Sequence, residues 1–165
     1  MNKRILWICL SLSLGLGVNQ GLLAQRAQAA AQPSIKENPT VRLTPPDQFE
    51  VAAQFDGYIH PGTATTILIQ ELADTHFQLI RTGLTPEYFA SQQLQLLQEE
   101  EVTTQSGLGG VLYTVRFTVD EVDFERQMLF AGDYQRTAWI VANYPVLVRQ
   151  EMAPVIRNSL LSVGW

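Results

Sequence analysis

The sequence predicts an α+β domain in which an antiparallel β-sheet, wound as a meander, is flanked by helices. Three segments of alternating apolar and polar residues follow one another at 111–119, 124–131 and 136–144. The turns that join them, at Asp120-Glu121 and Gly132-Asp133, are short. A parallel return needs a crossover of a dozen residues or more, so such turns permit only antiparallel hairpins. An apolar stripe at helical spacing after these strands supplies the α component.

Two further strands and two helices are expected ahead of the meander. Phe49–Phe55 predicts a short strand, and Thr65–Gln70, dense in β-branched residues, predicts a second one. Asp74 or Thr75 could cap a short helix over 77–80. Thr85-Pro86-Glu87 then provides a hydroxyl cap, a proline at the first helical position and an acid in the first turn, which predicts a helix that runs to Gln98.

The positions of proline and glycine and the spacing of apolar residues predict the remaining elements. Glu101–Gln105 is expected to pair ahead of the meander, through a turn at Gly107-Leu108-Gly109-Gly110. Residues 146–163 carry the helical stripe, and Pro154 inside it predicts a kink or restart near Ala153. Trp165 is expected to lie over the sheet edge.

The first 29 residues have the layout of a secretory signal peptide. Met1–Arg4 is basic, Ile5–Val18 is an apolar run and Ala27-Gln28-Ala29 is a small-x-small cleavage signature. The apolar run is shorter than the roughly 20 residues of a membrane-spanning helix, although an uncleaved anchor stays open. Cys9 lies in the middle of the run, which disfavours a lipoprotein.

Beyond residue 29 we expect a flexible N-terminal lead over 30–47 and a single domain over 48–165. The lead holds Pro33, Pro39, Pro45 and Pro46 and shows no sustained period, apart from a short extended piece at 41–43.

Removal of the signal peptide makes the chain strongly acidic. The sequence has 11 basic and 16 acidic residues, and Lys3, Arg4 and Arg26 leave with the signal, so 8 basic residues face 16 acidic ones. An acidic domain repels phosphate backbones, so nucleic-acid binding is not expected. The only cysteine also leaves, which excludes disulfides, a thiol nucleophile and cysteine-ligated metal from the mature chain.

The two histidines are weak candidates for chemistry. His60, before Pro61 in a corner with Asp56 and Tyr58, is the better one, against the alternative of a structural role there. His76 sits at a helix start. Neither shows the spacing of a metal-binding pair.

Acidic clusters, serines and a glycine-rich loop also lack the pattern of a site. Glu99-Glu100-Glu101 would point to alternate faces of a strand, and Asp120, Glu121, Asp123 and Glu125 resemble an exposed hairpin tip rather than a calcium loop. The 107–110 loop lacks the lysine of a phosphate loop. The serines without an evident base are Ser91, Ser106, Ser159 and Ser162, and the aromatics expected in the core or a ligand cleft are Tyr113, Phe117, Phe124, Phe130 and Trp139. We therefore predict no catalytic, cofactor or metal site.

Three short motifs resemble those of the PsbP/DcrB-like superfamily of exported proteins. They are Phe55-Asp56-Gly57-Tyr58, Ala142-Asn143-Tyr144-Pro145 and Leu160-Leu161-Ser162-Val163, and the resemblance covers about 49–165. It implies an α/β/α sandwich and a non-catalytic accessory role, in some members with photosystem assembly or with manganese or calcium. No metal ligand of the family matches a position here.

The leading hypothesis is an exported, non-enzymatic accessory protein that binds a protein partner, in the periplasm or, in a photosynthetic organism, in the thylakoid lumen. No membrane span is expected after signal cleavage. A second hypothesis is a small-molecule or lipid-binding domain with an apolar cleft between the terminal helix and the sheet. A third is a cryptic hydrolase that uses His60 with a nearby acid.

Overall fold

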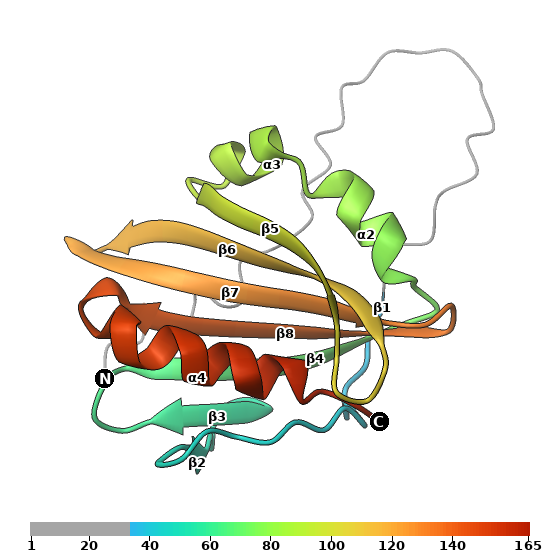
Figure 1. Ribbon diagram of the computed structural model, residues 1–165, viewed down its shortest axis with the longest axis horizontal. Coiled ribbons are helices and arrows are strands. Elements are labelled where there is room, and N and C mark those ends of the chain that lie inside the picture. The colour runs from blue at the N-terminus through green and yellow to red at the C-terminus, as the bar shows by residue number, and fades with distance from the viewer. Residues whose placement is uncertain (1–33) are drawn as a thin grey trace. The chain divides into compact units, whose positions relative to one another are not determined.

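A computed structural model describes residues 34–165, which belong to one compact unit that begins at residue 33 (Figure 1). The predicted signal peptide over 1–29 lies outside the described residues. Three α-helices and one 3₁₀ helix accompany an open β-sheet within the described part. The helices are α2 (Phe77–Gly83), α3 (Pro86–Ser91), η1 (Val146–Val148) and α4 (Arg149–Leu161).

The sheet has the strand order β2-β3-β4-β8-β7-β6-β5, and β1 pairs separately with β4. Every pairing is antiparallel. The strands are β1 (Ser34–Ile35), β2 (Glu50–Val51), β3 (Gly57–His60), β4 (Thr65–Ala73), β5 (Gln95–Thr103), β6 (Gly109–Val119), β7 (Val122–Gly132) and β8 (Arg136–Pro145).

The predicted meander is confirmed, because β5, β6, β7 and β8 are neighbours in chain order. The β6–β7 turn consists of Asp120 and Glu121, whose φ angles of 48° and 67° belong to the two-residue turn that matches strand twist. Strand β8 then pairs with β4 along eight positions, from Thr66 opposite Asn143 to Ala73 opposite Arg136. The result is an α+β fold around an open antiparallel sheet.

The helix predicted to run to Gln98 is wrong in its second half. Its start is confirmed, since the Thr85 hydroxyl accepts from the Tyr88 amide at 3.2 Å and Pro86 follows. Helix α3 ends at Ser91, however, and Gln93 turns the chain with a φ of 59°. Residues 95–103 become β5, because pairing with β6 satisfies their backbone and outweighs the helix propensity of glutamine and leucine.

Of the kink or restart expected near Ala153, the restart is absent. The chain forms the 3₁₀ turn η1 and then α4, which continues past Pro154 to Leu161. A proline at this position removes one backbone hydrogen bond, to the carbonyl of Gln150. Burial of Met152, Ile156 and Leu160 against the sheet outweighs that loss.

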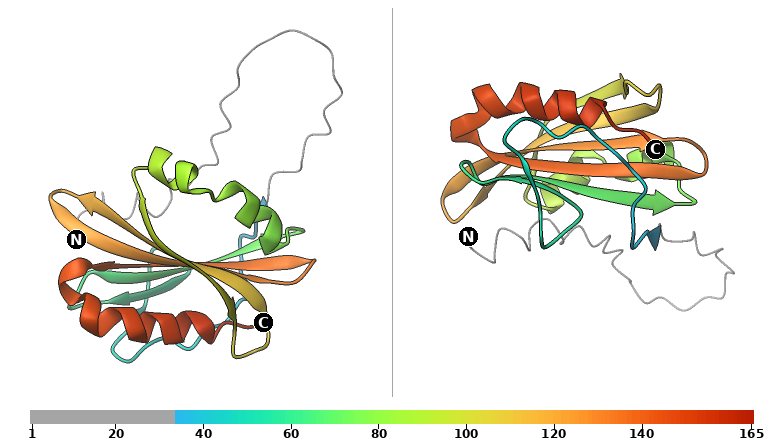
Figure 2. Two further views of the ribbon diagram at one scale, coloured as in Figure 1. Left: turned by 45° about the horizontal axis from the view of Figure 1, so that its top comes forward. Right: turned by 90° about the horizontal axis from the view of Figure 1, so that it is seen from below.

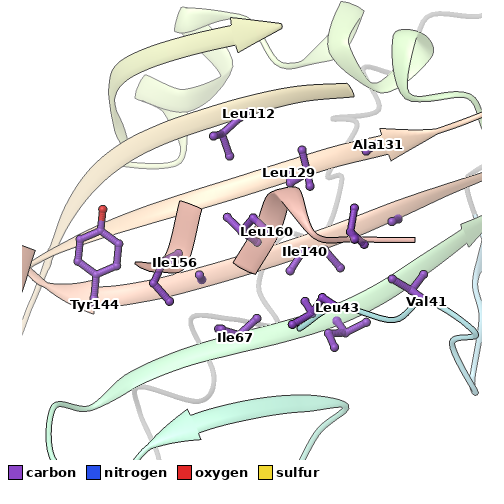
Figure 3. Packing of buried hydrophobic residues seen from close by; sticks show 14 of the residues in the cluster. Val41, Leu43, Ile67, Leu112, Leu129, Ala131, Ile140, Tyr144, Ile156 and Leu160 are labelled. Atoms are coloured by element: carbon purple, nitrogen blue, oxygen red, sulfur yellow. The ribbon is translucent and has the colours of Figure 1, made fainter. Parts of the chain in front are cut away.

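Helix α4 lies along one face of the sheet (Figure 2) and closes the main core there. Ile156 and Leu160 point at Ile67, Leu129 and Ile140 (Figure 3), and all five side chains are fully buried. The opposite face carries aromatic contacts between strands and α3, and the rings of Phe89 and Tyr113 lie 5.3 Å apart there. The aromatics predicted for the core are buried, except that Phe117 is only partly so.

Part of the segment expected as a flexible lead packs on the sheet, since β1 pairs with β4 and residues 34–165 belong to one compact unit. Val41 and Leu43 are buried in the main cluster. Between them, Arg42 forms two backbone hydrogen bonds with Gly164, at 2.8 and 2.9 Å. This packing arises because the apolar side chains of Val41 and Leu43 flank Arg42, whose backbone is extended. The prolines around this segment concealed its burial in the sequence.

Glu71 of β4 anchors the same segment. Its buried carboxylate accepts hydrogen bonds from the Thr40 amide at 2.6 Å and the Thr40 hydroxyl at 3.0 Å, and pairs with the Lys36 ammonium at 3.3 Å. Burial alone would raise the pKa of Glu71, but the hydrogen bonds from Thr40 and the Lys36 charge together lower it.

Replacing Glu71 by Gln is therefore expected to lower the free energy of unfolding at neutral pH by about 1–3 kcal/mol. A carboxyl with a lowered folded pKa stabilises the fold above its unfolded pKa, and this stabilisation is lost as the pH falls through the folded value. The deficit of the variant in urea unfolding should accordingly shrink between pH 7 and pH 3. Glu37→Gln, an exposed carboxylate of the same segment, is the matched control; an equal loss in both variants would contradict the anchor.

Candidate functional site

A surface groove of about 460 Å³ runs between residues 44–49 and one side of α4. Its volume lies within the range of small-ligand pockets. Phe49, Met152 and Val155 provide apolar lining, and His60 reaches it from the end of β3. We refer to this feature as the α4 groove.

Serine hydroxyls attach one wall of the α4 groove to the helix. Ser159 donates to the Thr44 carbonyl at 2.7 Å, and the Thr44 amide donates to the Ser162 hydroxyl at 2.8 Å. Ser162 in turn donates to the Ser159 carbonyl at 2.6 Å. Residue 44 is therefore held in place, and the chain reverses after it through Gln48, whose φ is 68°.

His60 is brought into the groove, as the better of the two histidine candidates, but its ring is oriented as a hydrogen-bond donor. The Gly62 amide donates to His60 Nδ1 at 3.1 Å, and Phe49 packs edge-on at 5.3 Å. A neutral ring whose Nδ1 accepts carries its proton on Nε2. In this tautomer Nε2 is a donor and cannot accept a proton from a nucleophile. Asp56 and Tyr58, its neighbours in sequence, do not line the groove.

The serines singled out by the sequence analysis all make structural hydrogen bonds. Ser159 and Ser162 line the groove, yet their hydroxyl protons are donated to backbone carbonyls. Ser91 donates to the Tyr88 carbonyl at 2.7 Å, and Ser106 to the Val163 carbonyl at 2.6 Å. None of these contacts joins a serine to a histidine.

The charge of the groove is acidic. Asp47 and Glu151 line it, and no lysine or arginine among residues 34–165 does. Together with Phe49, Met152 and Val155, these carboxylates suit an apolar group that carries a positive charge or several hydrogen-bond donors. An anionic ligand would meet repulsion from both carboxylates.

The Glu99-Glu100-Glu101 run does not converge on a common point, which confirms the alternation expected in a strand. Arg81 of α2 contacts Glu99 at 2.9 Å and also pairs with Glu101. Arg157 of α4 holds Glu100 through two bonds, at 2.8 and 2.9 Å. Within residues 34–165, no group of three or more potential ligand side chains is placed to bind a metal ion.

Glu125 was expected at an exposed acidic tip, and this is wrong. Asp120, Glu121 and Asp123 are exposed, but Glu125 is 1% exposed. Its carboxylate lies 2.8 Å from Arg116 Nη2 and 3.1 Å from Arg149 Nε, and it accepts from the Tyr144 hydroxyl at 3.2 Å. The two arginines come from β6 and α4, so no local pattern could show that they would meet.

Burial, reinforced by the Glu125 charge, raises the pKa of Tyr144 to about 12. The phenol therefore stays protonated and keeps donating to the Glu125 carboxylate throughout the physiological range. Gln127 links this cluster to the helix, since its amide donates to Tyr144 and to the Ala153 carbonyl, both at 3.2 Å. The cluster thus fixes the start of α4 on the sheet.

His76 and Arg126 complete the polar side chains of interest. His76, rather than Asp74 or Thr75, caps α2, since its Nδ1 accepts from the Gln78 amide at 3.2 Å, and its ring stacks on Tyr134. Sequence reasoning missed Arg126, which is 2% exposed, bonds Asn143 at 2.7 Å and lies over the Phe117 ring. The available signal was its position on one face of the predicted strand, with Phe124, Met128 and Phe130.

These features describe a class of protein: an open antiparallel α+β domain with a preformed acidic groove beside its C-terminal helix. Among residues 34–165, no helix is long and apolar enough to cross a membrane. The sequence matches no known protein family, and no curated protein matches it.

Solved structures do share the fold. LpqN, described as involved in cell envelope biogenesis of Mycobacterium tuberculosis, matches with a TM-score of 0.59 and 10% identity, over 82% of this chain and 86% of that chain. PA94 from Pseudomonas aeruginosa, of unknown function, matches with a TM-score of 0.50 and 13% identity, over 82% and 85%. At such identities the likeness concerns the fold, and membership of the PsbP/DcrB-like superfamily stays a prediction.

Proposed function

We propose that the chain is an exported, non-catalytic accessory protein of the cell envelope that binds a partner protein in the α4 groove. The observation that carries this proposal is the groove itself: a preformed hollow with apolar lining and two carboxylates. The fold of LpqN, a protein described as involved in cell envelope biogenesis, supports the compartment. In a photosynthetic organism the same role would belong to the thylakoid lumen, beside a complex such as a photosystem.

A non-catalytic role agrees with the chemistry of the groove. His60 presents a donor nitrogen, and Ser159 and Ser162 are committed to backbone carbonyls. Hydrolysis by a nucleophile–base pair would require a hydroxyl and an accepting nitrogen within hydrogen-bond reach.

The apolar cleft of the second hypothesis does not gain support. It was expected between the terminal helix and the sheet, where Ile156 and Leu160 instead fill the core with Ile67, Leu129 and Ile140. A lipid chain would find no room at that interface. Polar side chains make up most of the lining of the α4 groove, and among the described residues Phe49 is its one aromatic hydrophobic residue.

We further propose the three-layer arrangement of the PsbP-like fold. Its support is the pair of arginines that bind the carboxylates of β5: Arg81 from α2 reaches Glu99 and Glu101, whereas Arg157 from α4 reaches Glu100 between them. Neighbouring strand residues point to opposite faces.

The groove is tested with two arginine substitutions on exposed positions of α4. Asn158→Arg places a cation and a long side chain in the groove, while Gln150→Arg makes a comparable charge change on a residue outside its lining. We expect Asn158→Arg to reduce recovery of the partner from native membranes at least tenfold, and Gln150→Arg to leave it unchanged.

A photo-crosslinking residue provides the second measurement. Placed at Val155, which lines the groove, it should give a discrete adduct that is missing when the same residue is placed at Gln150. Equal adducts from both positions, or no reproducible partner across several salt concentrations, would contradict the proposal. If a small molecule co-purifies with the protein and is lost in Asn158→Arg, the ligand is a small molecule, as in the second hypothesis, and not a protein partner.

A further inference from the structure

The second surface of interest is the free edge of the sheet at β5. Strand β5 is the last in the order, pairs with β6 alone, and forms one margin of the sheet (Figure 1). None of its nine residues exchanges a backbone hydrogen bond with a described residue outside β6. Its outer amide and carbonyl groups therefore stand unpaired among residues 34–165.

Natural proteins protect such edges with short strands, prolines, bulges or charges that project over the edge. Strand β2, at the other margin, is two residues long and fits that rule. Strand β5 contains no proline, and its single irregularity lies between Leu96 and Gln98. A regular edge of six residues remains, from Gln98 to Thr103.

The charges of β5 are held on the faces of the sheet. Arg81 fixes Glu99 and Glu101, and Arg157 fixes Glu100 on the other face. These contacts draw the carboxylates toward the helices, and a backbone can approach the edge between them. Two guanidinium groups balance three carboxylates, so one negative charge is left over, and the Glu101 side chain is 73% exposed.

We infer that the β5 edge binds an extended, basic segment of a partner protein by strand addition. Backbone hydrogen bonds would pair the segment with β5, and lysine or arginine at alternate positions would face Glu101 and its neighbours. The chain beyond residue 29 has more acidic than basic residues, and this negative net charge favours a basic partner.

Charge argues against a second copy of this chain as the occupant. Antiparallel self-pairing centred on Glu100 would place Glu100 opposite Glu100 and Glu99 opposite Glu101. Like charges directly opposite each other destabilise a strand pair. A strand rich in lysine would instead place lysines opposite these glutamates, so that the cross-strand pairs attract each other.

The test uses a seven-residue peptide of alternating lysine and valine, added to the whole protein. Binding should slow amide hydrogen exchange within 95–103. Only alternate amides of an added strand face β5. Two further peptides are therefore compared, one with every valine amide N-methylated and one with every lysine amide N-methylated. The peptide whose methylated amides face β5 should bind at least tenfold more weakly, and the other should bind as the unmodified peptide does. Equal binding by both methylated peptides would overturn strand addition and leave charge attraction alone.

Two variants separate the edge from other surfaces. Glu101→Gln should weaken the peptide several-fold, whereas Glu121→Gln, the same change on the β6–β7 turn, should not. The inference rests on the proposed binding role but not on the groove, so Asn158→Arg should leave peptide binding intact. Concentration-dependent dimers with slowed β5 exchange in the absence of peptide would instead identify a second copy as the occupant and overturn the inference.

Discussion

Truncation of Ile156 to alanine is expected to lower the free energy of unfolding by about 2–5 kcal/mol. Ile156 is completely buried in the middle of α4, above Ile67 and Ile140 (Figure 3). The loss combines the transfer of the removed carbons with the cavity that they leave, because the sheet below cannot collapse into it. Urea unfolding followed by far-ultraviolet circular dichroism measures the effect.

Val155→Ala is the matched control for this variant. Val155 precedes Ile156 on the same helix, but its side chain is 38% exposed and borders the groove. We expect its free energy of unfolding to change by less than about 0.5 kcal/mol. Similar midpoints for the two variants would show that α4 does not close the core.

The second large effect is expected from Gly57→Ala. Gly57 opens β3 with a φ of 150°, and a Cβ atom there would lie 1.9 Å from the carbonyl oxygen of Ile67. The backbone of β3 or β4 would have to move, at a cost of about 3 kcal/mol from strain and overpacking. The expected result is a lower urea midpoint and, since β3 carries His60, a displaced groove.

Gly83→Ala provides the comparison. Gly83 ends α2, and a Cβ atom there meets nothing within 4 Å. Removal of glycine from such a site should leave stability unchanged or raise it by about 0.4–1 kcal/mol, by restricting the unfolded chain. If Gly57→Ala were equally harmless, the close approach between β3 and β4 would be wrong.

Local signals account for the parts of the fold that the sequence predicts well. The β6–β7 and β7–β8 hairpins depend on short turns and on alternation within one segment, and both are confirmed. The helix N-terminus at Thr85 is equally local. Residues 95–98 were misassigned because their strand conformation depends on β6, and no local period carries that information.

The site was less accessible to sequence reasoning. His60 was singled out, but the α4 groove joins it to residues 44–49 and to α4, which lie about a hundred residues apart. Residues 44–47 belong to the segment expected to be a flexible lead, whose prolines conceal the burial of Val41 and Leu43. The burial of Glu125 likewise depends on arginines from two distant elements.

The pairing of Arg42 with Gly164 has a consequence for the order of events during folding. The two residues are separated by nearly the whole domain, and the buried Val41, Leu43 and Val163 flank their contact. A polypeptide that emerges from the ribosome N-terminus first can form its hairpins early, but it cannot form this contact until residue 164 has been released. The domain therefore completes its core only when residues 163 and 164 are available to pack, and until then the side chains of Val41 and Leu43 lack their C-terminal cover.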